Sequence, residues 1–159
     1  MDSYISLISP ALTVVGWSIA YRLAKVNSTR TESKSLLDGC GLIIEKLAEE
    51  GSSFFLKGSS SLTEKKAYES LVHNKIALLH NKFEYLDKRG IKLSLNYISE
   101  LHISLTYSVP QHGSAELKSE KCVNDIFKCS SSTILVLQMK FHEKYPPIDS
   151  FLSLKHYLK

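Results

Sequence analysis

The sequence predicts an all-α protein in which a single N-terminal transmembrane helix is followed by an antiparallel cytosolic helical bundle. Three observations support this prediction. The opening stretch Ser3–Tyr21 contains no charged residue and is followed directly by Arg22. Later segments repeat apolar residues every three or four positions, which is the spacing of one buried helix face. No glycine-rich phosphate loop or nucleophile motif interrupts this pattern.

The composition fits one compact domain with an appendage. The chain has 159 residues, of which 43% are hydrophobic and 23% charged, and these proportions exclude wholesale disorder. Its formal net charge of +4 is mild, and acidic and basic residues alternate along most of the chain, so no nucleic-acid-binding stripe is expected. Cys40, Cys122 and Cys129 form an odd, widely spaced set, which predicts reduced thiols.

Residues 4–25 are predicted to form the transmembrane helix, because about 20 helical residues cross a hydrocarbon layer of about 30 Å. Cations follow this run and do not precede it, which argues against a cleaved secretory signal. The same asymmetry predicts a bacterial inner-membrane protein with residues 1–3 outside and residues 26–159 in the cytoplasm. A buried helix of a soluble protein is the alternative interpretation.

Two sets of residues in and after this helix are predicted to have roles. Gly16, Ala20 and Ala24 recur every four residues and form a strip that would let two helices pack closely, although small residues are also tolerated facing lipid. The second set comprises interfacial aromatics and cations that would anchor the helix at the membrane surface, either setting topology alone or also contacting anionic lipid. Its members are Trp17, Tyr21, Arg22, Lys25, Arg30 and Lys34.

The predicted cytosolic domain, 26–159, begins with a helix whose apolar stripe runs from Leu36 to Leu47 and which ends at Gly51. An internal loop over 51–61 follows, with Phe54 and Phe55 against the core.

The longest predicted helix covers Leu62–Lys88. Ser61 and Glu64 have the spacing of a capping box at its start, and Gly90 supplies a left-handed residue after its end. Its apolar residues alternate spacings of three and four, as in a helix packed lengthwise against neighbours.

The segment 91–109 is ambiguous, because its apolar residues fit both a helical stripe and the alternation of a strand. We expect a helix, with a bent strand or hairpin as the alternative. Two more helices are predicted, one from Ser114 to Cys129 and one from Ile134 to Tyr145, the latter stopped by Pro146. A last amphipathic turn is expected over 150–158.

No residue is predicted to be catalytic, to bind a cofactor or to hold a metal ion. Cys122, Cys129 and His142 could be combined into a zinc site, but the spacing of the two cysteines places both sulfurs on the apolar stripe of Ile126. Structural zinc sites use closer cysteine pairs and four ligands. We therefore expect that the protein is not an enzyme.

These features favour a membrane-anchored interaction or sensing module that recruits a protein at the cytoplasmic membrane face. Its expected partners are membrane lipid and either a second copy of the chain, in a homo-oligomer, or another protein. The alternative is a membrane-perturbing effector of the toxin or phage-defence type that oligomerises through its transmembrane helix. A nucleic-acid binder is a third hypothesis, which would need a soluble first helix and a basic face.

Overall fold

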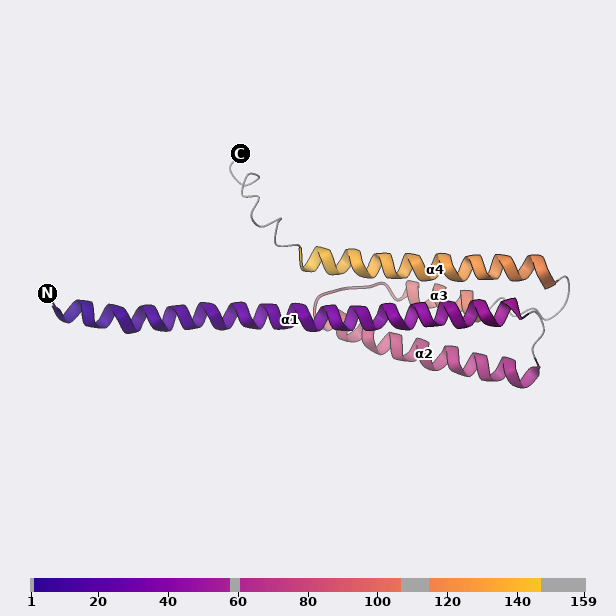
Figure 1. Ribbon diagram of the computed structural model, residues 1–159, viewed down its shortest axis with the longest axis horizontal. Helices are drawn as coiled ribbons and strands as arrows, with labels where there is room; N and C mark the ends of the chain where they lie inside the picture. The colour runs from indigo at the N-terminus through magenta and orange to yellow at the C-terminus, as the bar shows by residue number, and fades with distance from the viewer. Residues whose placement is uncertain (1, 58–60, 107–114, 147–159) are drawn as a thin grey trace, which may run out of the picture. The chain divides into compact units, whose positions relative to one another are not determined.

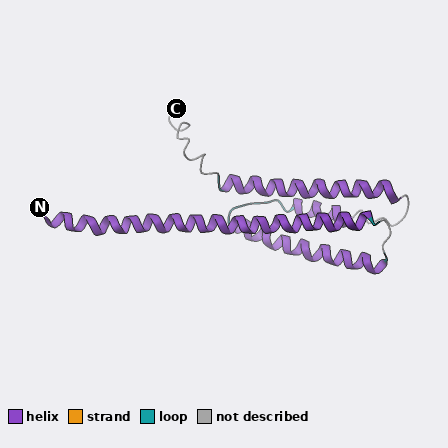
Figure 2. Cartoon of the chain, in the orientation of Figure 1, coloured by secondary structure: helices purple, strands orange, loops and turns teal. Residues whose placement is uncertain are grey.

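The computed structural model describes residues 2–57, 61–106 and 115–146, with side chains at positions 10, 12–57, 61–106 and 120–146 (Figure 1). Helices dominate these ranges, and none of the described residues forms a strand (Figure 2). The prediction of an all-α protein is therefore confirmed. The helices are α1 (Asp2–Leu56), α2 (Leu62–Lys88), α3 (Asn96–Thr106) and α4 (Ala115–Lys144).

The chain divides into two compact units, Met1–Ser35 and Leu36–Lys159. The first unit contains the N-terminal part of α1. The second unit contains the remainder of α1 together with α2, α3 and α4, and one hydrophobic core draws on all four of these helical segments. The predicted helical bundle is therefore confirmed in the second unit.

The predicted transmembrane helix is wrong. Among the residues whose side chains are described, no helix is long and apolar enough to cross a membrane. In the described part of the predicted span, Thr13 and Ser18 lower the hydrophobicity, and Arg22 and Lys25 follow. Too few apolar residues therefore follow one another to cross a hydrocarbon layer. The predicted single-pass topology at an inner membrane depended on this helix and is therefore also wrong. Side chains 4–9 and 11 of the predicted span lie outside the described residues.

Helix α1 does not end at Gly51 but continues to Leu56, so the connection to α2 is shorter than predicted. Gly51 is buried, and a Cβ atom there would lie 2.6 Å from Leu105 Cδ2, 3.1 Å from Tyr68 Oη and 3.3 Å from Ile126 Cδ1. These neighbours belong to α3, α2 and α4 respectively. The glycine therefore serves close helix packing and not helix termination.

Aromatic rings join α1 to α2 next to this glycine. The rings of Phe54 and Tyr68 stack with centroids 4.0 Å apart, and Phe55 lies edge-on to both. Nearer the middle of the pair, Lys75 Nζ lies 2.6 Å from Glu50 Oε1. Residue numbers rise on α1 as they fall on α2, so the two helices are antiparallel.

Helix α2 begins as its sequence predicts. The Ser61 amide donates to Glu64 Oε2 at 2.8 Å, and the Glu64 amide donates to Ser61 Oγ at 3.2 Å, which completes the capping box. Gly90 follows the end of the helix with a φ of +80°, a conformation that residues with a Cβ rarely adopt. The buried face of α2 consists of Tyr68, Val72, Leu79, Phe83 and Leu86.

Helix α3 confirms the helical interpretation of residues 96–106, but residues 91–94 are not helical. Ile91 is buried although it lies in this connection, because its side chain joins the core of the second unit. Residues 107–109 of the predicted helix lie outside the described residues.

Helix α4 is one continuous helix where two were predicted. The serines at 130–132 do not interrupt it. The hydroxyl group of the next residue bonds within the helix: Thr133 Oγ1 donates to the Cys129 carbonyl one turn earlier at 2.8 Å. The turn expected over 150–158 lies outside the described residues.

We predict that valine at position 51 destabilises the second unit, whereas valine at position 41 does not. Gly51→Val should lower the free energy of unfolding by about 1–3 kcal/mol, since the new side chain overpacks a filled core. Gly41→Val is the matched control, because a Cβ there meets nothing within 4 Å, and its effect should stay within about 0.5 kcal/mol. Urea unfolding of both variants checks this; equal losses would contradict the packing role of Gly51.

Candidate protein-binding surface

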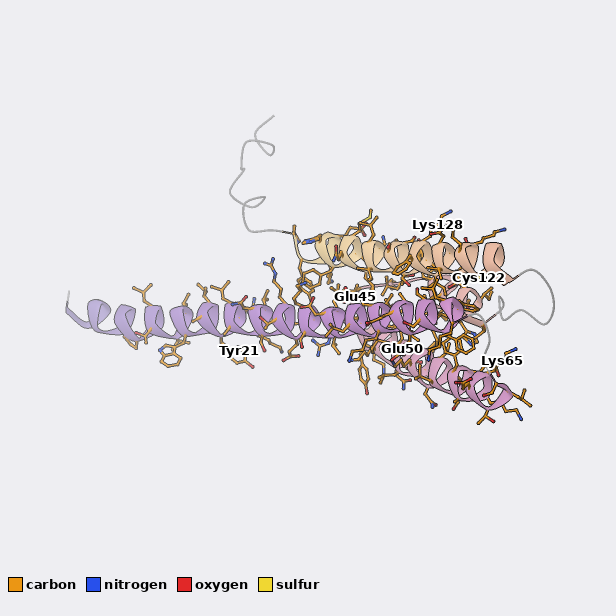
Figure 3. All side chains as sticks on the ribbon, turned by 45° about the vertical axis from the view of Figure 1, so that its right-hand side comes forward. Tyr21, Glu45, Glu50, Lys65, Cys122 and Lys128 are labelled. Atoms are coloured by element: carbon orange, nitrogen blue, oxygen red, sulfur yellow. The ribbon has the colours of Figure 1, made fainter. Side chains whose placement is uncertain are left out.

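The first unit exposes an unusual amount of apolar surface. Its apolar side chains from position 12 to 26 are each between 54% and 74% exposed. They are Leu12, Val14, Val15, Trp17, Ile19, Tyr21, Leu23 and Val26. Figure 3 shows Tyr21 projecting outward from its helix. Large contiguous apolar patches on a protein surface mark binding sites more often than chance.

Five of these side chains lie on one face of α1. Their spacings of three, four, four and three residues keep them within one side of a helix, as in a coiled-coil seam. We call this set the aliphatic stripe; it consists of Leu12, Val15, Ile19, Leu23 and Val26. The stripe was not predicted from the sequence, because the whole apolar run was interpreted as lipid-facing, although its spacing of three and four residues is visible there.

The predicted strip of small residues is exposed at all three positions, Gly16, Ala20 and Ala24. A Cβ atom added at Gly16 would meet nothing within 4 Å. Helix packing through this strip stays a prediction.

The predicted anchor residues are also accessible. Trp17, Tyr21, Arg22, Lys25 and Lys34 are exposed, and Arg30 is half-buried. Their predicted role at a membrane surface depended on the span that the structure contradicts.

The cations give the first unit a strongly basic stretch. Arg22, Lys25 and Arg30 are its only charged residues between Asp2 and Glu32. Hydroxyl groups along the same stretch bond to carbonyls of the helix; Ser18 Oγ, for example, donates to the Val14 carbonyl at 2.9 Å. The exposed surface of this helix is therefore apolar and cationic.

The second unit carries an elongated groove between α1 and α4. Two hollows of about 280 and 460 Å³ share Glu45 and Ile134 and form what we call the α1–α4 groove. Figure 3 shows Glu45 on the α1 side of this unit. Leu42, Leu56 and Phe127 line the groove, and each is about half to two-thirds exposed. Its floor is therefore accessible apolar surface.

The rim of the groove is acidic. Asp38, Glu45 and Glu49 line the two hollows, and neither hollow has a lysine or arginine among its lining residues. Each carboxylate belongs to α1, so the acidic rim follows one wall of the groove. An apolar floor beside an acidic wall suits an amphipathic helix with a basic flank.

A buried serine is one of the residues beside this groove. Ser130 is 3% exposed, lines the larger hollow, and its Oγ has no hydrogen-bond partner among the described residues. Buried polar side chains normally have a partner, because an unsatisfied one costs free energy. Because this oxygen is itself inaccessible, Ser130 is not counted among the contacts of the groove.

The cysteines belong to the core or its edge. All three are free thiols; Cys40 and Cys122 are buried and Cys129 is partly buried. In the part of the chain that the structure describes, no three His, Cys, Asp or Glu side chains gather to hold a metal ion.

Burial changes the acidity of two core groups. It raises the pKa of the Cys40 thiol to about 11, and the nearby positive charge of Lys82 offsets part of the increase. Burial, with a smaller contribution from the negative charge of Glu50, holds the pKa of Tyr68 far above its ordinary range. Both side chains are therefore protonated at neutral pH.

Comparison with known proteins gives no match: no family model, no curated protein and no solved structure matches this chain.

We predict a pH-dependent loss of stability that depends on Cys40. The thiol has a raised pKa in the folded state, so its contribution is fully present below pH 9 and disappears as the pH rises through about 11. The total loss should be on the order of 2–3 kcal/mol in the free energy of unfolding.

Urea unfolding between pH 8 and 11 measures this loss, with Cys40→Val as the control. Other groups titrate equally in both proteins, so the difference between the two curves isolates the thiol. Parallel curves for the wild type and Cys40→Val would contradict the assignment.

Proposed function

We propose that the protein is a helical interaction module that binds a protein partner through the aliphatic stripe. The second unit provides a folded bundle, and the first unit presents the binding helix. The observation that carries the proposal is the exposure of five aliphatic side chains on one helix face. Helices with such a face bind proteins by laying it into an apolar groove.

The energy available from the stripe supports this proposal. Full burial of one large aliphatic side chain stabilises a complex by about 1.5–3 kcal/mol. Because the five side chains are between 54% and 66% exposed, their burial can contribute about 4–10 kcal/mol, which is comparable to the lower and middle part of the roughly 4–15 kcal/mol that association costs in lost freedom. The flanking cations Arg22 and Lys25 would add orientation and would favour an acidic partner surface.

Two earlier expectations bear on this proposal. Self-association remains part of it, since a second copy is one of the protein partners expected. The membrane-perturbing effector depended on a transmembrane helix, and the finding that contradicts this helix removes its basis. Absence of enzymatic activity stays a prediction.

We predict that an aspartate in the stripe abolishes partner binding. Ile19→Asp places a charge at the middle of the stripe and should reduce the amount of stably bound protein, whether a second copy or another chain, at least tenfold. Thr13→Asp adds the same charge to an exposed position on the side of the helix away from the stripe and from Arg22 and Lys25, and should leave binding within about twofold of the wild type. Chemical cross-linking and affinity purification of the full chain measure both. Identical results for the two variants would refute the proposed function.

A further inference from the structure

We propose that the partner is a second copy of this chain, and that the aliphatic stripe of one copy binds the α1–α4 groove of another. This inference rests on the proposed function and names its partner. It joins two features of the same chain, the exposed aliphatic stripe and an apolar groove with one acidic wall.

Charge complementarity is the first argument. The stripe is flanked by Arg22 and Lys25, and no carboxylate occurs between Asp2 and Glu32. The groove is lined by Asp38, Glu45 and Glu49 without a lysine or arginine. Opposite charges at the edge of an apolar contact steer association and select the orientation of the bound helix.

Size and chemistry are the second argument. Leu12–Val26 extends over about 21 Å at the helical rise of about 1.5 Å per residue, and the wall of the groove from Leu37 to Leu56 extends over about 28 Å. The groove can therefore accept the whole stripe. A helix in the groove would also cover Leu42, Leu56 and Phe127, which are each about half to two-thirds exposed.

The other hollow described for the second unit fits the stripe less well. It lies between α3 and α4 and is lined by Glu100, Asp125 and Lys128, so a cation stands beside its carboxylates. A basic helix would meet repulsion from Lys128 there. The α1–α4 groove is the site that charge favours.

A second copy of the chain supplies both features in equal number. The stripe belongs to the first unit and the groove to the second, so a homo-oligomer contains as many grooves as stripes.

Charge reversal provides the test. The stripe variant carries Arg22→Glu and Lys25→Glu, and the groove variant carries Glu45→Lys and Glu49→Lys. We expect wild-type protein to self-associate and each variant alone to associate at least tenfold more weakly, because like charges then meet at the rim. An equimolar mixture of the two variants should recover association, because the acidic stripe of one variant then faces the basic groove of the other.

Light scattering coupled to size-exclusion chromatography measures the mass of each sample. The matched control carries Lys66→Glu and Lys92→Glu, two exposed lysines outside the stripe and groove, and should associate within about twofold of the wild type. Circular dichroism should report the same helix content for all variants.

Three results would overturn the inference. One is a monomeric wild type, including at high concentration. Another is failure of the mixed variants to recover association. The third is association that both charge variants retain but Ile19→Asp abolishes, which would leave the proposed function intact and move the binding site elsewhere. If Ile19→Asp also retained every association, the proposed function itself would fail.

Discussion

The core of the bundle depends on the fit of three side chains, one each from α2, α3 and α4, against Gly51 of α1. The side chains of Tyr68, Leu105 and Ile126 converge on this glycine from α2, α3 and α4, and a Cβ atom there would lie only 2.6 Å from Leu105 Cδ2. The Tyr68 hydroxyl group donates to the Leu105 carbonyl at 3.1 Å. This carbonyl lies in the last turn of α3, where carbonyl groups have no partner within the helix, so the bond supplies a donor to a helix end.

Helix α1, which contains Gly51, contributes one face to the core and another to the surface of the second unit. Because α1 packs against α2 with Phe54 and Phe55 on one side, residues such as Leu42 and Glu45 of the same helix face the opposite direction, toward the groove shared with α4. One helix therefore contributes to both the core and the proposed binding groove. The groove is thus built on a well-packed element, which suits a surface that must keep its shape for a partner.

Local chemistry made parts of this fold predictable. The capping box of Ser61 and Glu64 and the left-handed Gly90 use interactions within a few residues, so they could be recognised without tertiary information. The buried stripe of α2 was predictable for the same reason, since its spacing of three and four residues reflects one helix face. In contrast, the ends of α1 and the continuity of α4 were predicted wrongly, because glycine and serine break helices only where packing does not compensate.

The proposed binding surface was less predictable. Its stripe is visible in the spacing of Leu12, Val15, Ile19, Leu23 and Val26. The uncharged stretch was nevertheless interpreted as a membrane span, because apolar residues can contact either lipid or protein. The groove combines residues of α1 and α4 that lie far apart in the chain, such as Glu45 and Ile134, and no local pattern identifies such a pair. By itself the sequence determined the helical class, the caps and the apolar faces, which depend on neighbours within a turn or two. Only the tertiary structure decided where helices end, that Gly51 serves packing between helices, and where the groove lies, because these features depend on contacts between residues distant in the chain.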